Sequence, residues 1–188
     1  MPRMNRTVSR NLNCGRSAIL TLFLFAPAVQ AGELSQVPDG PRHELGLKDA
    51  QGHQRSLDEF RGEVVLINFW ASWCTPCVQE MPSLLRLQKS LRGYPFRVVG
   101  INVAEGERRA QAAAARLGLD FPVLLDPDSR VFKAWGGEVL PTTYILDGSG
   151  KARYVAQGPL DWDRVDIQHM LEDLMQERVD RPGAGRGQ

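Results

Sequence analysis

The sequence predicts an α/β fold of three layers, with a β-sheet of mixed strand direction between helices on both faces. Apolar, β-branched runs of strand length occur at 63–70 and 96–104, as in strands that are buried on both faces. Segments with apolar residues at helical spacing alternate with the strands, which is typical of crossover units. The segment 142–158 is typical of two strands joined by a Gly-rich turn, so we expect an antiparallel hairpin at the end of the sheet.

The first 31 residues have the three parts of a secretory signal peptide. Four arginines without an acidic residue precede the apolar run 18–29, and the small residues of "VQA" end at Ala31. The run is shorter than the roughly 20 apolar residues that span a membrane. We therefore expect a signal peptide at 1–31 that is cleaved after Ala31 and a periplasmic or other extracytoplasmic protein. An uncleaved segment would instead anchor the chain in the membrane, and a core helix is the third alternative.

The 157 residues after the signal are enough for one domain with its own core. The leader carries four of the 23 basic residues and none of the 22 acidic ones, which leaves 19 against 22 and a net charge of −3. This balance does not favour nucleic acid or an anionic membrane surface as a partner. Cleavage also removes Cys14, so Cys74 and Cys77 remain in a compartment where disulfides persist.

Each element of the domain follows from a local pattern. Residues 32–42 are polar and rich in Gly and Pro, which predicts a linker. A short strand near 44–48 and a return segment ending at Gly62 predict an N-terminal β-hairpin. We then expect, in order, a strand at 63–70, a helix from Thr75 to "RGYP", a strand at 96–104, an Ala-rich helix at 106–119, a strand at 121–126, a short helix at 129–136, the hairpin at 142–158 and an amphipathic helix at 161–176. The domain would span 43–176, before a disordered tail at 177–188.

The stretch "NFWASWCTPCVQEMP" (68–82) contains the residues of greatest chemical interest. A buried strand leads directly into Cys-x-x-Cys at a helix start, which is the context of a redox pair. Unpaired N–H groups and the helix dipole favour a thiolate on Cys74, and Pro76 stiffens the first turn. Cys77 lies one turn deeper on the same face, within reach of a disulfide. We expect Cys74 to be the exposed nucleophile and Cys77 the buried resolving thiol, with no cofactor besides this pair.

Two other uses of the cysteines fit the sequence less well. A zinc site requires four ligands, and His43, His53 and His169 do not stand at ligand spacing from one another. A purely structural disulfide across two residues closes so small a loop that it removes little chain entropy. We therefore predict neither a metal site nor a purely structural disulfide at the two cysteines.

In "FWASWCTPC" (69–77), "EMP" (80–82) and "LPTTYILDGSGK" (140–151), the sequence resembles the thioredoxin superfamily, in particular its exported TlpA/ResA/CcmG-type branch. The resemblance extends from about His43 to about Gln176. It implies a thioredoxin-like fold, in which the N-terminal hairpin is an extension and 107–135 is the helix-strand insertion of this branch. It also implies thiol-disulfide oxidoreductase activity on client proteins.

The resemblance assigns roles to residues around the pair. Pro141 matches the cis-proline beside the cysteines, and Leu140 would pair with an incoming peptide as a strand does. Trp73 directly precedes Cys74, and Pro76 lies between the two cysteines. Trp73 would offer the client an apolar contact, although core packing also explains a tryptophan. We therefore expect Trp73, Pro76, Leu140 and Pro141 to bind the client.

Asn68 stands where cytoplasmic thioredoxins carry a buried acid, and Glu80 resembles the substitute found in this branch. Glu80 lies one helical turn beyond Cys77, so both can face the same buried region. A half-buried carboxyl beside a thiol has a raised pKa, which would let Glu80 accept or supply the proton of Cys77. The alternative is a solvated glutamate on the helix surface.

The residues between the cysteines predict the direction of the reaction. Thr75 and Pro76 carry no charge, whereas strongly oxidising relatives place a His there, which favours the reduced thiolate. We expect a monomeric protein-disulfide reductase. The resemblance implies clients such as apocytochrome c or copper-site proteins, and a membrane thiol carrier as electron donor. An exported disulfide oxidase or isomerase and a copper-binding assembly module on the same cysteines are the alternatives.

Overall fold

The computed structural model describes residues 32–37 and 44–179. The predicted signal peptide, Cys14, His43 and residues 180–188 lie outside the described residues. The strands are β1 (Glu33–Gln36), β2 (Leu47–Asp49), β3 (Gln54–Arg55), β4 (Val64–Trp70), β5 (Phe96–Val103), β6 (Val123–Asp126), β7 (Thr142–Leu146) and β8 (Ala152–Gln157). The helices are α1 (Thr75–Ser90), α2 (Glu107–Leu117), α3 (Arg130–Ala134) and α4 (Val165–Val179), with a 3-10 helix η1 at Leu57–Phe60.

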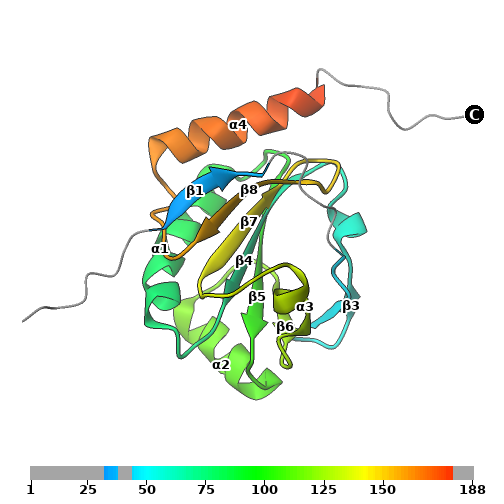
Figure 1. The fold of residues 1–188 in the computed structure, drawn as a ribbon, viewed down its shortest axis with the longest axis vertical. Coiled ribbons are helices and arrows are strands. Elements are labelled where there is room, and N and C mark those ends of the chain that lie inside the picture. Colours follow the sequence, from blue (N-terminus) through cyan, green and yellow to red (C-terminus); the bar gives the residue numbers. More distant parts are fainter. Residues whose placement is uncertain (1–31, 38–43, 180–188) are drawn as a thin grey trace, which may run out of the picture.

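In the described part of the chain, one eight-stranded sheet has the order β1-β8-β7-β4-β5-β6-β2-β3 (Figure 1). Neighbours β4 and β5, and β5 and β6, are parallel, whereas the other neighbouring pairs are antiparallel. The predicted mixed α/β fold is confirmed, including the N-terminal hairpin β2–β3 and the inserted elements from α2 to α3.

Strand β4 lies in the interior of the sheet, between β7 and β5, and all seven of its residues are buried. Alternate side chains of a strand point to opposite faces. Val64, Leu66 and Trp70 contribute to one apolar core, which also contains residues of α1, α2 and α4. Val65, Ile67 and Phe69 contribute to a second core, which contains residues of α3 and η1. The continuous apolar run in the sequence therefore reflects a strand that is covered on both faces.

The second core is built around aromatic side chains. The Phe69 ring lies 5.3 Å from Phe132 and 5.4 Å from Trp135, measured between centroids. Tyr144 adds an edge-on contact with Trp135 at 5.3 Å. These contacts hold α3 against β4 and β7, so the insertion has a fixed position beside the end of β4.

The N-terminal boundary differs from the prediction. Residues 33–36, predicted as part of a linker, form the edge strand β1 and pair antiparallel with β8, from Glu33 opposite Gln157 to Gln36 opposite Tyr154. Only Leu34 of this strand is partly buried, so the segment has no apolar pattern for a sequence prediction to use. Residues 38–42 of the predicted linker lie outside the described residues.

The C-terminal boundary differs as well. Helix α4 extends to Val179, three residues beyond the predicted end of the domain. The charged residues at this end interrupt the apolar spacing from which the end was predicted. The predicted tail therefore begins as helix at 177–179, and the rest of it lies outside the described residues.

Candidate active site

The two cysteines lie where β4 passes into α1, on the edge of the sheet at which the parallel strands end. Cys74 is the N-cap of α1, and its Sγ accepts a hydrogen bond from the N–H of Cys77 at 3.3 Å. The two are joined by a disulfide, with Cα atoms 5.3 Å apart. Cys74 is 6% exposed and Cys77 is fully buried. An incoming group can therefore reach the pair only at Cys74.

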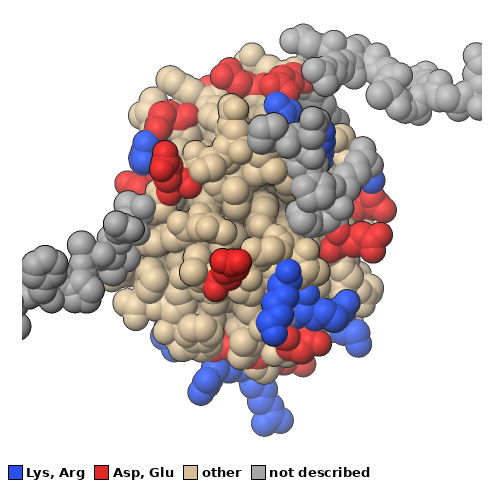
Figure 2. All heavy atoms as spheres, viewed as in Figure 1, with Lys and Arg blue, Asp and Glu red and all other residues tan. Residues whose placement is uncertain are grey.

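Four of the predicted site residues meet around one hollow of about 550 Å³. Trp73, Cys74, Pro76 and Leu140 line it, together with residues of α3 and the loop after it. Trp73 is 59% exposed and Val139 is 50% exposed, which is unusual for large apolar side chains. In Figure 2 the surface over β7 and its neighbouring loops is largely free of charged side chains, whereas Lys and Arg gather over α2 and α3. Trp73 and Val139 could therefore contact an apolar side chain of another protein, while Lys133 and Glu138 place charges on the α3 side of the hollow.

The segment before β7 lies beside the pair. The Leu140–Pro141 peptide bond is cis, as the resemblance implies, and Pro141 is buried. The carbonyl of Pro141 accepts from the N–H of Gly158 at 2.8 Å. The backbone of Leu140 makes no backbone–backbone hydrogen bond within the described residues. Its N–H and C=O can therefore pair with another chain.

Glu80 is buried on the inner side of the pair, one turn along α1 from Cys77. Its Oε1 accepts from Asn68 Nδ2 at 2.7 Å. Its Oε2 accepts from the backbone N–H of Leu160 at 3.0 Å and from Trp162 Nε1 at 3.1 Å. Glu80 is only 4% exposed, so the alternative of a solvated surface glutamate is wrong. Its carboxyl is also buried more deeply than the half-buried group that we expected.

Burial raises the pKa of Glu80 to about 7, although the hydrogen bonds from Leu160, Asn68 and Trp162 act in the opposite direction. A carboxyl with this pKa exchanges its proton near neutral pH, as a general acid or base requires. It lies one helical turn from Cys77, whose sulfur must gain or lose a proton whenever the disulfide opens or closes. Its place on α1 and its pKa are therefore those of a candidate partner for that proton.

Another buried carboxylate, Glu105, lies beyond the end of β5 and was not predicted. It accepts hydrogen bonds from the N–H and the hydroxyl of Ser72 and from Asn102 Nδ2. Burial alone would raise the pKa of Glu105, but the hydrogen bonds from Ser72 and Asn102 outweigh it, and the pKa is lowered. The ionised Glu105 therefore fixes the turn that carries Trp73 and Cys74 without acting as a proton donor.

The contacts of Glu80 with Leu160 and Trp162 were also missed, because they come from a loop about 80 residues further along the chain. One signal was available in the sequence. Trp162 stands between two aspartates in "LDWDR", where a large apolar residue has no reason to occur unless it is buried. For Glu105, the signal was its place directly after a parallel strand, where such sheets gather their functional residues.

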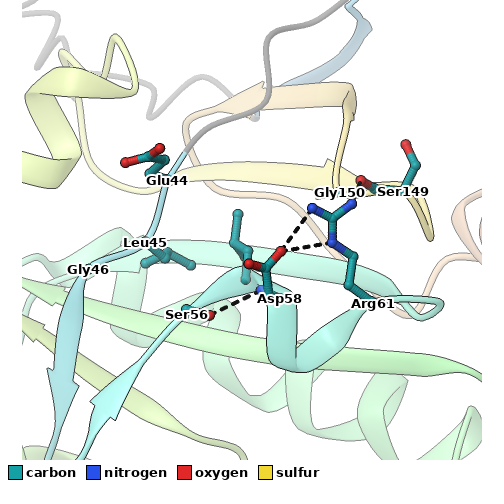
Figure 3. Close-up of a pocket in the computed structure, with 9 residues that line it drawn as sticks. Glu44, Leu45, Gly46, Ser56, Asp58, Arg61, Ser149 and Gly150 are labelled. Atoms are coloured by element: carbon teal, nitrogen blue, oxygen red, sulfur yellow. Dashed lines mark hydrogen bonds and ion pairs between the residues drawn. The ribbon is translucent and has the colours of Figure 1, made fainter.

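A hollow of about 380 Å³ lies away from the cysteines, between the segment before β2, η1 and the β7–β8 turn (Figure 3). Its main cation, Arg61, pairs with Asp58 at 2.8 Å and donates to the carbonyl of Ser149. The Ser56 hydroxyl accepts from the N–H of Asp58 as part of a capping box. These groups satisfy one another and fix the ends of η1, so the hollow has a structural explanation.

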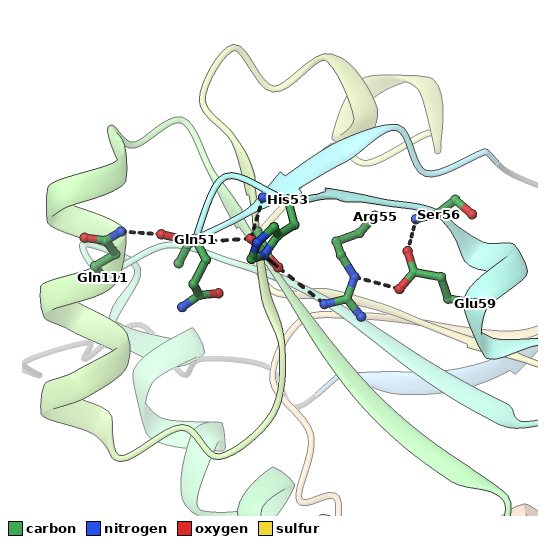
Figure 4. Close-up of polar contacts among 8 residues, drawn as sticks. Gln51, His53, Arg55, Ser56, Glu59 and Gln111 are labelled. Atoms are coloured by element: carbon green, nitrogen blue, oxygen red, sulfur yellow. Dashed lines mark hydrogen bonds and ion pairs between the residues drawn. The ribbon is translucent and has the colours of Figure 1, made fainter.

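The N-terminal hairpin is held by a polar network on Asp49 (Figure 4). The Asp49 carboxylate accepts from the N–H groups of Gln51 and His53, both at 2.9 Å, and pairs with Arg55 at 3.4 Å. Gln111 of α2 donates to the carbonyl of Ala50 at 2.6 Å. The network closes the turn and ties the hairpin to α2, which explains a buried aspartate without a catalytic role.

Metal ligands do not gather in the described chain: within 32–37 and 44–179, no three His, Cys, Asp or Glu side chains are placed to hold an ion. Over the same ranges, none of the helices is both long and apolar enough to cross a membrane.

Comparison with known proteins agrees with this geometry. The Redoxin family matches residues 26–174 of the chain. The chain is 34% identical over 128 residues to "Thiol-disulfide oxidoreductase ResA" of Geobacillus thermodenitrificans, which covers 68% of this chain and 72% of the relative. It is 36% identical over 130 residues to "Thiol:disulfide interchange protein DsbE" of Allochromatium vinosum, which covers 68% and 70%.

Solved structures show the same fold. The crystal structure of a putative thiol:disulfide interchange protein DsbE from Chlorobium tepidum superposes with a TM-score of 0.63 at 26% identity. The match covers 78% of this chain and 99% of that chain.

Proposed function

The chain belongs to the Redoxin family and is a thiol-disulfide oxidoreductase, and on that premise we propose that it reduces disulfides of client proteins outside the cytoplasm. The observation that carries the proposal is the Cys74–Cys77 pair at the start of α1, with Cys74 at a hollow of about 550 Å³ and Cys77 buried one helical turn from Glu80. The pair itself is the redox group of the proposed reaction, and the proposal includes no metal and no further cofactor.

The reaction begins with the reduced protein. The Cys74 thiolate attacks one sulfur of the client disulfide, whose S–S bond breaks as the mixed disulfide forms. The released client sulfur takes a proton from solvent and becomes a thiol, while the other client sulfur stays bonded to Cys74. Cys77 then gives its proton to Glu80, and its thiolate attacks the Sγ of Cys74. The second client sulfur takes the proton back from Glu80 and leaves as a thiol, so two electrons pass to the client and the protein ends with the Cys74–Cys77 disulfide.

Local structure supports these roles for the two sulfurs. Cys74 occupies the N-cap of a 16-residue helix, where its Sγ already accepts one backbone N–H, and the helix dipole stabilises a negative charge there. Cys77 is fully buried, so its thiol keeps its proton until a nearby base removes it. Glu80 is that base in our proposal, because it is one turn away and has a pKa of about 7.

The client would bind across the hollow beside Cys74. We propose that its backbone pairs with the free N–H and C=O of Leu140 next to Pro141, as an added strand. Trp73 and Pro76 would provide the apolar surface on the other side. Asn68 does not reach this surface, since it is fully buried behind the pair, and its place in the proposal is to hold Glu80.

The direction of the reaction rests on Thr75 and Pro76. Neither residue adds positive charge near Cys74, so its thiolate is stabilised less than in a strong oxidant, and the reduced protein gives electrons away more readily. Clients would be proteins such as apocytochrome c or copper-site proteins, and a membrane thiol carrier would return the electrons. These partners, the cleaved signal at 1–31 and the monomeric state are part of the proposal.

The test is to trap the mixed disulfide in cells with Cys77→Ser, which leaves Cys74 unable to release its client. We expect a covalent adduct that is released by a reducing agent, with the client identified by mass spectrometry. The matched control is the Cys74→Ser variant, which retains one thiol but lacks the nucleophile and should form no such adduct.

Three results would contradict the proposal. A folded, exported Cys77→Ser protein that captures no client would exclude thiol exchange. A Cys74–Cys77 pair that is mainly oxidised in growing cells would indicate an oxidase or isomerase. Stoichiometric retention of copper by the purified reduced protein would favour a metal-binding assembly module.

A further inference from the structure

The loop between β8 and α4 folds over Glu80 and fixes one of its two oxygens. Oε2 receives both the N–H of Leu160 and the indole N–H of Trp162, whereas Oε1 receives only Asn68 Nδ2. Trp162 is fully buried, and its backbone N–H donates to Ser83 Oγ at 3.1 Å. Ser83 in turn donates to the carbonyl of Glu80 at 2.7 Å. The indole is therefore tied to the same helical turn as the carboxyl that it contacts.

This asymmetry determines which oxygen can bind a proton. A carboxylate oxygen has two lone pairs for hydrogen bonds, and both lone pairs of Oε2 are used by N–H donors. A proton on Oε2 would displace one of these donors and leave it buried without a partner, which is costly. Oε1 has one lone pair free. Protonation at Oε1 is thus the arrangement that keeps all of the hydrogen bonds to Oε2.

Asn68 faces Oε1 with an amide that can match either protonation state. Its Nδ2 donates to Glu80 Oε1 and, at 2.8 Å, to Thr143 Oγ1. Its Oδ1 is buried and has no hydrogen-bond partner among the described residues. After a half-turn of the amide, Oδ1 would accept from a protonated Oε1 and from the Thr143 hydroxyl, which can donate as well as accept, while Nδ2 would take the partnerless position that Oδ1 now occupies. An ionised aspartate at this position could only accept, so it could pair with Glu80 only when Oε1 carries the proton.

We propose that Trp162 and Asn68 are positioning residues for the proton step of thiol exchange. Trp162 occupies a lone pair of Oε2, so that Glu80 binds and releases its proton at Oε1. Asn68 rotates its side-chain amide according to whether Oε1 carries the proton. The inference rests on the proposed role of Glu80 and adds the atom at which that role is performed.

Few charged groups face Glu80, so hydrogen bonds control its proton. On α1 the neighbouring Cys74 and Cys77 are joined in a disulfide and do not titrate, while β4 and β7 contribute the neutral Asn68 and Thr143. The hollow on the outer side of Glu80 is lined by Arg86 and Asp161, and Arg86 is ion-paired with Asp163. None of these charges contributes to the raised pKa of Glu80, whose causes are burial and three hydrogen bonds.

The test is Trp162→Phe in the oxidised full chain, with the Glu80 carboxyl titrated by carbon NMR. The substitution removes one donor to the ionised carboxylate, so we expect the pKa of Glu80 to rise by about one pH unit. Trp135→Phe is the matched control. It removes a buried indole N–H that donates to the carbonyl of Glu44 at 3.2 Å, from the core on the opposite face of the sheet, and should leave the titration unchanged.

A second readout identifies the oxygen. As Glu80 is protonated, the Asn68 side-chain amide signals should shift strongly, while the Trp162 indole proton should remain hydrogen-bonded and protected from exchange. An unchanged Glu80 titration in Trp162→Phe would overturn the proposal, and so would loss of the indole hydrogen bond on protonation. If Trp162→Phe does not fold, Asn68→Leu removes the donor to Oε1 and should raise the pKa of Glu80 similarly.

The experiment needs neither a client nor free thiols. A failure to trap a client would therefore contradict the proposed function without affecting the titration. An unchanged titration beside successful trapping would contradict only the inference about Trp162 and Asn68.

Discussion

The buried carboxyl of Glu80 makes the stability of the oxidised protein depend on pH in a way that can be calculated. Its pKa is about 7 in the folded protein, whereas the ordinary pKa of a glutamate, which applies to the unfolded chain, is 4.5. Between these two values the folded state holds the proton and the unfolded state does not. The group therefore contributes stability that is fully present below pH 4.5 and is lost as the pH rises through 7.

The size of this effect follows from the difference between the two pKa values. Each pKa unit corresponds to about 1.4 kcal/mol, so the difference between 4.5 and about 7 amounts to about 3 kcal/mol of unfolding free energy. Glu80→Gln removes the titration while keeping the shape of the side chain. We expect this variant to gain about 3 kcal/mol relative to the wild type between about pH 4 and pH 8.

Urea unfolding of both oxidised proteins across this pH range measures the difference directly, because other titrating groups contribute equally to both. Glu105→Gln is the control with the opposite sign. The pKa of Glu105 is lowered, so the wild type should gain stability over that variant as the pH rises. If Glu80→Gln and the wild type keep a constant difference across the whole range, Glu80 does not have a raised pKa and its assignment as the proton acceptor fails.

Two further predictions concern the redox pair and the sheet edge. Pro76→His places an imidazole between the cysteines and should stabilise the thiolate, which shifts the equilibrium with glutathione toward the reduced protein by about tenfold, or about 30 mV. An unchanged potential would mean that Thr75 and Pro76 do not set the direction. A Cβ on Gly32 would lie 2.5 Å from the carbonyl oxygen of Gly158, so Gly32→Ala should cost about 1 to 2 kcal/mol in urea unfolding and speed amide exchange in β1. Gly46→Ala, whose nearest contact would be 3.8 Å away, should cost less, and equal losses would contradict the reasoning.

Much of the site could be predicted from the sequence because its signals are local. Three patterns follow one another along the chain: the apolar run of β4, the cysteines at the start of α1 and the helical spacing of apolar residues in α1. Each can be recognised within a few residues and has one structural interpretation. Pro141 was different. Its cis bond was expected only from the resemblance to the thioredoxin superfamily, since an isolated X–Pro bond in a sequence gives little reason to expect cis.

The sequence by itself determined the strand that leads to the cysteines, the helix that begins directly after Cys74 and the helical turn that separates Glu80 from Cys77. Only the tertiary structure decided that Glu80 is buried and which of its oxygens is free, because Leu160 and Trp162 reach it from a loop about 80 residues away. It also decided that the polar residues 33–36 form β1, through backbone hydrogen bonds to β8 that leave no trace in side-chain pattern. Local periodicity reports what a segment forms, whereas burial and proton affinity depend on what distant segments place against it.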